Sequence, residues 1–114
     1  MRGDQVALLG ALAWRFPALR ASLDEHLNDN DGEVLPHPLM SDYERWAEQA
    51  LHAGEAGVSE FLDVLEDAYR NGGDEVENLI SVSFLEHLPR PGEPGAEIRD
   101  LLGPLLRKQL GVIG

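Results

Sequence analysis

The sequence contains no cysteine and few aromatic residues (6%). The lack of cysteine excludes disulfide bonds, thiol nucleophiles and cysteine-ligated zinc sites, and it is typical of proteins from a reducing compartment. Four histidines, scattered along 114 residues, show no pattern of a metal-rich fold. A chain of this length buries roughly 65% of its unfolded surface and needs no metal or disulfide for stability. We therefore predict one domain, residues 1–114, without a metal or another cofactor.

Long apolar runs are also missing. The best candidate, VALLGALAW (Val6–Trp14), is much too short to span a bilayer. It is unlike a signal peptide, because Asp4 weakens its positive flank and Arg15 follows without a small-residue cleavage site. The sequence thus predicts a cytoplasmic protein with no membrane partner.

Lysine and arginine are scarce in the middle of the chain, where aspartate and glutamate are frequent. The net charge is −12, and residues 24–86 hold 17 acidic side chains against Arg45 and Arg70, a net −15. Residues 1–23 carry +2 and residues 87–114 carry +1. Such a chain repels nucleic acids and anionic membranes and attracts basic proteins. The simpler interpretation is that the acidity only keeps the protein soluble.

Apolar residues recur at helical spacing along almost the whole chain, and no hairpin signal separates alternating runs. The pattern predicts an all-α fold, a single compact irregular bundle of five to six helices. The expected ranges are about 4–15, 17–27, 39–52, 58–71, 74–88 and 96–110. The two helices on either side of Gly72-Gly73 would also suit one unit of a helical-repeat stack, although no second copy is visible.

Three segments interrupt the helical pattern. The prolines of GEVLPHP (Gly32–Pro38) predict an irregular link, and PRPGEPG (Pro89–Gly95) predicts an exposed connector. Gly103-Pro104 predicts a kink or a split in the last helix.

The helix over 74–88 is apolar nearly all round, which places it at the centre of the bundle. Its β-branched residues near Ile80 make a strand the alternative there.

The stretch NDNDGEVLPH (Asn28–His37) is similar to a calcium-binding loop. With Gly32 at position 6 of an EF-hand, Asp29 and Asp31 fall at positions 3 and 5. Position 1 is then Leu27 and position 12 is Pro38, so the first ligand and the bidentate glutamate are both missing. We interpret the stretch as a helix C-terminus followed by a turn.

Other catalytic or metal-binding patterns are weak. His26, Glu33 and His37 have ligand types that suit zinc, but their spacing matches no HxxxH or HExxH arrangement. The sequence has no P-loop, no dinucleotide-binding loop and no nucleophile elbow, so an enzyme is the less favoured hypothesis. It survives as an alternative: a small metal- or ligand-binding domain or enzyme centred on Glu33, His37, Asp42 and Glu86.

Several polar residues stand among apolar ones. An unpaired buried polar group costs about 1–3 kcal/mol, so such residues either face solvent or form a network. The candidates for a structural network are His37, Arg45, Asn78 and Glu86. The functional alternative is a recognition patch of carboxylates around an exposed Trp46.

Three segments resemble a known family. They are GEVLPHPLMSDYERW (Gly32–Trp46), NLISVSFLEHL (Asn78–Leu88) and LLGPLLRKQL (Leu101–Leu110). They are similar to a family of small, acidic, helical bacterial proteins catalogued as a domain of unknown function. The matching motif residues are Gly32, Glu33, Leu35, Pro36, His37, Asp42, Trp46, Asn78, Leu79, Ser83, Phe84, Glu86, Gly103 and Pro104. The resemblance implies a bacterial cytoplasmic protein without an established enzymatic activity.

The favoured functional hypothesis is a protein-binding module. Some small acidic families of this kind resemble immunity proteins, so the most specific form is an immunity protein or antitoxin that covers the positive active site of a basic toxin, such as a nuclease. Its partner would be a basic protein rather than a nucleic acid or a membrane. The expected contact residues are Asp29, Asp31, Glu33, Asp42, Trp46, Glu60, Asp63, Glu66 and Asp67. Those of the helix over 58–71 lie on more than one face, so they cannot all contact one flat partner.

Overall fold

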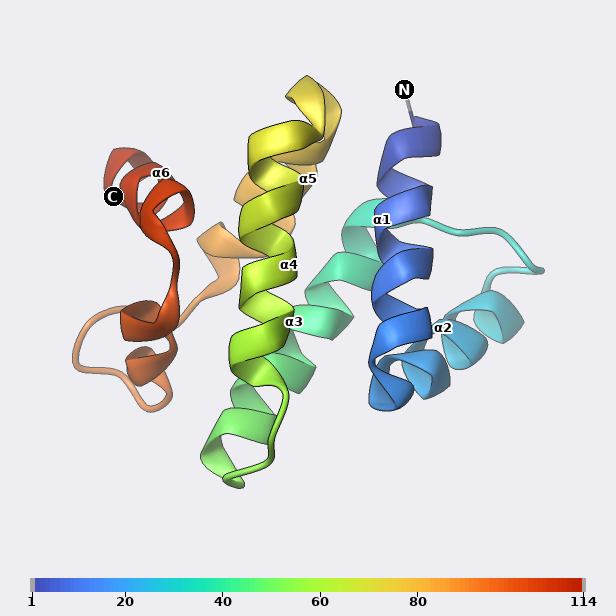
Figure 1. Cartoon of the computed structure of the whole chain (residues 1–114). Helices are drawn as coiled ribbons and strands as arrows, with labels where there is room; N and C mark the ends of the chain where they lie inside the picture. The colour runs from blue at the N-terminus through green and yellow to red at the C-terminus, as the bar shows by residue number, and fades with distance from the viewer. Residues whose placement is uncertain (1, 114) are drawn as a thin grey trace.

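The computed structural model describes residues 2–113, which fold into an irregular bundle of helices (Figure 1). The α-helices are α1 (Arg2–Arg15), α2 (Pro17–Asp29), α3 (Pro36–His52), α4 (Val58–Asn71), α5 (Gly73–Ser83) and α6 (Pro104–Ile113). Two 3-10 segments, η1 (Leu85–His87) and η2 (Ala96–Leu101), lie between α5 and α6. Residues 2–113 contain no strand, so the all-α prediction is confirmed and the strand alternative near Ile80 is wrong.

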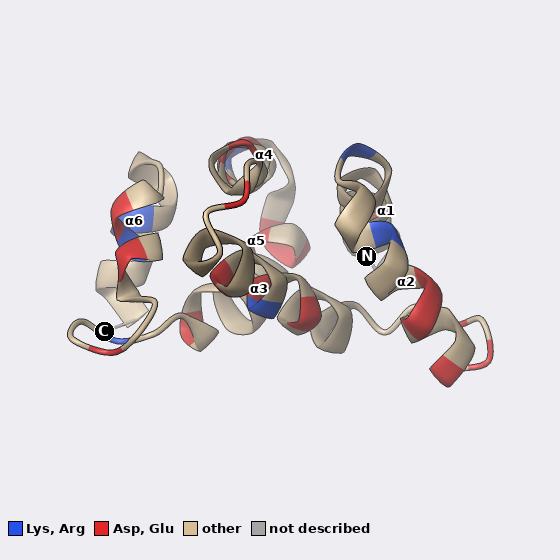
Figure 2. Ribbon diagram, turned by 90° about the horizontal axis from the view of Figure 1, so that it is seen from below, with Lys and Arg blue, Asp and Glu red and all other residues tan. Residues whose placement is uncertain are grey.

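The helices lie in two unequal layers. α1, α4 and α6 lie on one side, and α3 crosses behind α4 on the other (Figures 1 and 2). α5 contacts α1, α3, α4 and η1, as expected of a central helix. The core between the layers contains the fully buried rings of Tyr43, Phe61 and Phe84. The hydroxyl of Tyr43 donates a hydrogen bond to the carbonyl oxygen of Leu9 (3.0 Å), which joins α3 to α1 through the core.

The start of α3 differs from the prediction. The prolines of GEVLPHP were expected to prevent regular structure, but α3 begins at Pro36 and includes Pro38 in its first turn. The first turn of a helix has no acceptor for its N–H groups, so proline loses nothing there and its fixed φ favours the helix. Pro36 is buried, which gives the early start a packing reason.

The helix expected over 74–88 ends earlier than predicted. α5 stops at Ser83, and Phe84 has φ −118° and ψ −65° before η1 begins. Phe84, Leu85 and Leu88 are all buried. The chain thus leaves the α-helix at Phe84 while these three apolar side chains stay in the core.

The expected interruption at Gly103-Pro104 is a complete split. The 3-10 segment η2 ends at Leu101, and α6 starts afresh at Pro104. The first free N–H groups of α6 are bound by a residue of α4, because Leu105 N (2.8 Å) and Leu106 N (3.0 Å) donate to the carboxylate of Glu66. α6 is thus held in place by a cap from another helix.

Candidate functional site

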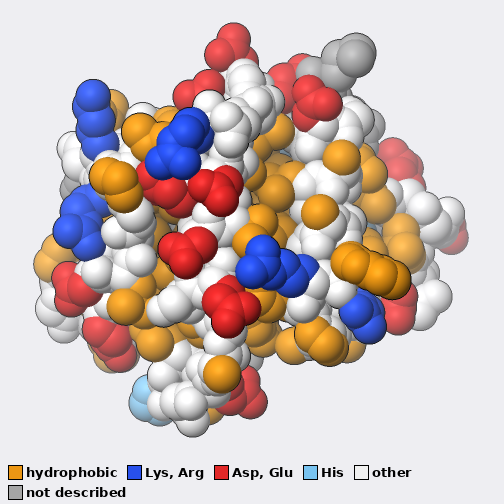
Figure 3. Space-filling model, viewed as in Figure 1, with side chains coloured by type: hydrophobic (Ala, Val, Ile, Leu, Met, Phe, Trp, Pro, Cys, Tyr) orange, Lys and Arg blue, Asp and Glu red, His pale blue; other side chains and the backbone are white. Residues whose placement is uncertain are grey.

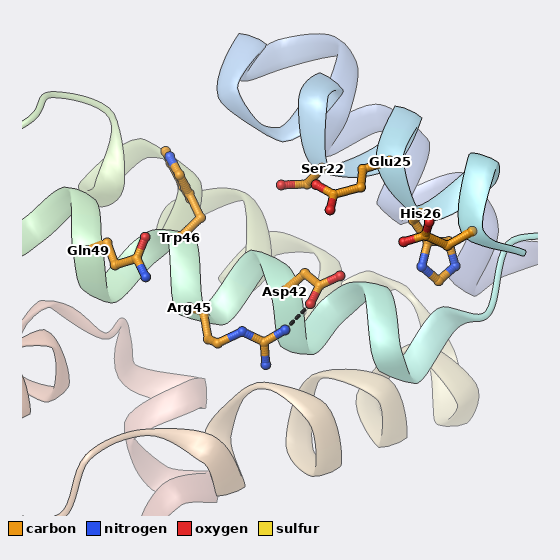
Figure 4. Close-up of a pocket in the computed structure, with 8 residues that line it drawn as sticks. Ser22, Glu25, His26, Asp42, Arg45, Trp46 and Gln49 are labelled. Atoms are coloured by element: carbon orange, nitrogen blue, oxygen red, sulfur yellow. Dashed lines mark hydrogen bonds and ion pairs between the residues drawn. The ribbon is translucent and has the colours of Figure 1, made fainter.

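A polar groove lies between α2 and α3 and has a volume of about 450 Å³ (Figure 4). Each helix contributes one stripe of side chains with spacings of three and four residues, so the members of each stripe share a helix face. The stripe on α2 is Ser22, Glu25, His26 and Asp29, and the stripe on α3 is Asp42, Arg45, Trp46 and Gln49. The two stripes face each other because the turn after α2 reverses the chain.

Carboxylates dominate the charge of this α2–α3 groove. Glu25 and Asp29 are exposed on the α2 side, and Asp42 is half-exposed on the α3 side. Arg45 is the single basic residue of the lining, and its guanidinium pairs with Asp42. Both partners remain open to solvent, with 59% of the Arg45 side chain and 37% of the Asp42 side chain exposed. Such a pair is weak and exchanges readily.

Trp46 forms an aromatic wall of the groove. Its ring centroid lies 6.1 Å from that of Phe16 and 5.3 Å from that of Phe61, so the indole is half-buried and fixed by the core. The sequence predicted an exposed Trp46, which the structure does not show. The tryptophan that stands in solvent is Trp14, which is 79% exposed. Arg20 lies over its ring, 5.3 Å from the centroid.

His26 closes one end of the groove and is only 6% exposed. Its Nε2 accepts a hydrogen bond from the backbone N–H of Leu35 (2.9 Å), which ties the end of α2 to the start of α3. Asn30 Nδ2 donates to the carbonyl oxygen of His26 (2.7 Å) and further braces this corner. Because Nε2 is the acceptor, the neutral ring carries its proton on Nδ1.

The acidic turn after α2 is a helix end, as the sequence predicted. The backbone N–H of Gly32 donates to the carbonyl oxygen of Leu27 (2.7 Å), which is the long hydrogen bond of a Schellman motif. Asp31 has φ +54°, a conformation that non-glycine residues seldom adopt. Of the acids expected to bind a partner here, Asp29 lines the groove, whereas Asp31 and Glu33 are exposed beside it.

The predicted four-residue network is divided into separate parts. His37 Nδ1 lies 2.6 Å from Ser83 Oγ, which joins α3 to α5. Arg45 pairs with Asp42 instead. Asn78 and Glu86 are exposed, so neither needs a buried partner. The structure therefore brings Asp42, Arg45 and Trp46 together in one groove and leaves His37 to a structural contact.

The acids of α4 occupy a different face from the groove. Figure 3 shows acidic side chains gathered over α4, where Glu60, Asp63 and Asp67 are exposed. Glu66 was expected to contact a partner but is only 6% exposed, and both its oxygens bind the N-terminus of α6. Glu66 therefore has no free surface to offer a partner.

A buried acid on α3 was missed by the sequence analysis. Glu44 is 2% exposed, and its Oε2 has no hydrogen-bond partner among the described residues. Burial raises the pKa of Glu44 to about 9; a hydrogen-bonding contact with Glu48 and the like charge of Glu48 add to the shift, and Arg45 opposes it. The raised pKa favours the neutral form of Glu44 at pH 7. Glu44 lies one helical turn after the apolar residue Met40, which is fully buried, and this spacing was the signal that Glu44 faces the core.

Other classes of site find less support. Among residues 2–113, no group of three or more His, Cys, Asp or Glu side chains is arranged to hold a metal ion. Glu33, His37 and Asp42 are not assembled into such a set. No described helix is both long and apolar enough to cross a membrane.

Comparison with known proteins assigns a family. Residues 10–111 match the family described as Domain of unknown function (DUF7674). The chain belongs to this family. The searches of curated proteins and of solved structures found no match.

The sequence did not predict Ser22, Glu25 and Gln49 as site residues, and it suggested His26 only as a metal ligand; all four line the groove. The polar stripe on residues 22–29 was readable from its spacing alone. What the spacing could not show was that this stripe faces Asp42 and Trp46 across the chain reversal.

Proposed function

We propose that this DUF7674 protein is a protein-binding module whose α2–α3 groove receives a basic partner. The observation that carries the proposal is the groove lining, where two carboxylates of α2 and one of α3 line the same groove as the half-buried indole of Trp46. Fixed aromatic rings and paired charges are typical of the strongest contacts at protein interfaces. In the most specific form of the proposal, the protein is a bacterial cytoplasmic immunity protein or antitoxin for a basic toxin.

The charge distribution supports a basic partner. The net charge of −12 creates a negative field that speeds encounter with a positive surface and weakens as salt is added. Asp31 and Glu33 extend the negative surface beyond the groove. A nuclease active site, which binds phosphate through positive charge, is complementary to such a surface.

The proposal is tested first by affinity capture from the native host at about 50 mM and about 500 mM salt, which changes the screening length about threefold. We expect one basic protein to be retained at low salt and reduced at high salt. The purified partner should then bind with an association rate that falls with salt, and a toxin should lose its activity in the complex. A partner that binds equally at both salts, or none at either, contradicts the proposal.

A pair of matched variants locates the interface. Asp42→Asn removes one charge inside the groove, whereas Asp63→Asn removes one charge from the exposed face of α4. We expect Asp42→Asn to weaken binding of the captured partner by about tenfold or more, a typical effect for a central charged contact. Asp63→Asn should change it by less than about threefold, as expected for a peripheral charge. Equal effects would place the interface elsewhere than the groove.

A further inference from the structure

The α2–α3 groove already holds a positively charged group of its own. The guanidinium of Arg45 pairs with Asp42 at the groove wall (Figure 4). This internal pair is solvent-exposed on both sides and therefore weakly held. The pair shows that a guanidinium reaches the Asp42 carboxylate at the groove wall. Because the pair is weak, another guanidinium can compete for the same carboxylate.

Two further carboxylates on the opposite wall are left without a basic partner. Glu25 and Asp29 line the groove from α2, are exposed, and have no salt bridge to a described residue. The groove thus has more negative charge than Arg45 can balance. A second cation entering between α2 and α3 would meet carboxylates on both walls.

A buried hydrogen-bond donor points to more than a bare cation. His26 is 94% buried, and its Nε2 is occupied by the N–H of Leu35, so the proton of the neutral ring lies on Nδ1. The ring lines the groove, and its only side-chain hydrogen bond among the described residues is the one at Nε2. A ligand that carries an acceptor such as a peptide carbonyl can accept the hydrogen bond of Nδ1.

We infer that the groove binds a single arginine residue of the partner chain. The arginine guanidinium replaces Arg45 on Asp42 and reaches the carboxylates of α2, and a main-chain carbonyl of the partner accepts the proton of His26 Nδ1. Trp46 lines the same groove, and a planar guanidinium stacks on an indole better than an ammonium does. Arg45 therefore competes with the partner's arginine for the carboxylate of Asp42. The inference rests on the proposed function, because it names the chemical group that the groove takes from a basic partner.

The test uses the indole of Trp46 as a reporter. Trp14→Phe removes the other, exposed tryptophan, so the single remaining indole N–H signal in an NMR spectrum belongs to Trp46. The probes are the capped tripeptides Gly-Arg-Gly, Gly-Lys-Gly and Gly-citrulline-Gly, titrated at constant low ionic strength. Citrulline has the shape of arginine without its charge. We expect saturable shifts of the Trp46 signal with the arginine peptide, weaker binding of the lysine peptide and none of the citrulline peptide.

Two variants distinguish competition by Arg45 at Asp42 from the general effect of removing one positive charge. Arg45→Gln should bind the arginine peptide about threefold more tightly, because the weak internal pair no longer competes. Arg15→Gln removes the same charge outside the groove and should leave the affinity nearly unchanged. Asp42→Asn should abolish saturable binding. Equal gains for Arg45→Gln and Arg15→Gln, or a loss of affinity in Arg45→Gln, would overturn the assignment of Arg45.

Failure of this inference is distinguishable from failure of the proposed function. If a basic partner requires Asp42 but no arginine peptide shifts the Trp46 signal in a folded protein, the arginine site is wrong and the binding module stands. If the arginine peptide binds with the expected order but no basic partner exists, the site stands and the proposed function is wrong. A lysine peptide that binds more tightly than the arginine peptide overturns the choice of arginine.

Discussion

The carboxylate of Glu66 in α4 lies directly against Gly103, so closely that a Cβ at position 103 would stand 2.7 Å from the carboxylate carbon. Both oxygens of that carboxylate accept hydrogen bonds from the first turn of α6. The close approach and the cap depend on each other, because only a residue without a side chain lets the carboxylate reach the helix end. This relationship explains why a glycine stands at position 103, directly before α6.

Gly103→Ala is therefore expected to destabilise the protein by about 1–3 kcal/mol, since the added methyl group forces Glu66 or α6 to move. Urea denaturation followed by circular dichroism measures the change. The matched control is Gly111→Ala. Gly111 lies within α6, and a Cβ at this position meets nothing within 4 Å. That substitution should stabilise the helix by up to about 1 kcal/mol. A neutral effect of Gly103→Ala would contradict the packing described above.

Glu66→Ala removes the cap of α6 and leaves two N–H groups without their acceptor. We expect a loss of about 1–2 kcal/mol in the free energy of unfolding, together with faster amide hydrogen exchange at Leu105 and Leu106. Asp67→Ala removes an acid from the next position, whose side chain is 71% exposed, and should cost less than about 0.5 kcal/mol. Similar losses for the two variants would argue against a capping role.

Glu44 should make the stability depend on pH. The pKa of its carboxyl group is raised from the ordinary value of 4.5, which applies to the unfolded chain, to about 9 in the folded protein. Between these two pH values the folded state keeps a proton that the unfolded state releases. Stability should thus fall between about pH 4.5 and pH 9, by at most about 1.4 kcal/mol per pH unit. Glu44→Gln keeps the shape of the neutral acid without the titration, so its advantage over the wild type should grow with pH across this range. Unfolding curves at pH 5, 7 and 8.5 measure it, and an advantage independent of pH would refute the raised pKa.

Asp31→Gly should stabilise the turn after α2. Asp31 has φ +54°, which costs a side-chain-bearing residue energy that glycine does not lose. We expect a gain of about 0.5–1 kcal/mol, measured by thermal and urea unfolding. Glu33→Gly, two residues on, is the comparison, since it also removes an exposed carboxylate near the turn. An equal gain from both would indicate relief of charge repulsion instead of backbone strain.

Much of the fold was predictable because it depends on local signals. Helical spacing of apolar residues predicted the helices, and the turn residues Asn28–Gly32 predicted the end of α2, which a Schellman hydrogen bond confirms. The structure differs from the prediction at the start of α3 and at the end of α5. Pro36 belongs to the first turn of α3, where its missing N–H costs nothing and its fixed φ favours the helix, so this boundary also has a local cause. The backbone at Phe84 ends α5 at Ser83, while Phe84 and Leu85 stay buried.

The groove was only half visible in the sequence. Asp29, Asp42 and Trp46 were candidates for partner binding because of their charge and ring chemistry, but Glu25, His26 and Gln49 were not. Glu66 was expected at a surface and is a buried cap. Charge alone cannot distinguish these roles, since an acid in an acidic chain looks the same whether it faces solvent or a helix end.

The sequence by itself determined the all-helical class, the absence of an EF-hand and the strong negative charge, because each depends on residue type and short-range spacing. Only the tertiary structure decided which polar stripes face each other, which acid is buried beside Glu48 and which caps α6. These depend on contacts between residues far apart in the chain, such as Glu66 with Leu105, and helical periodicity specifies the face of a helix without specifying what that face meets.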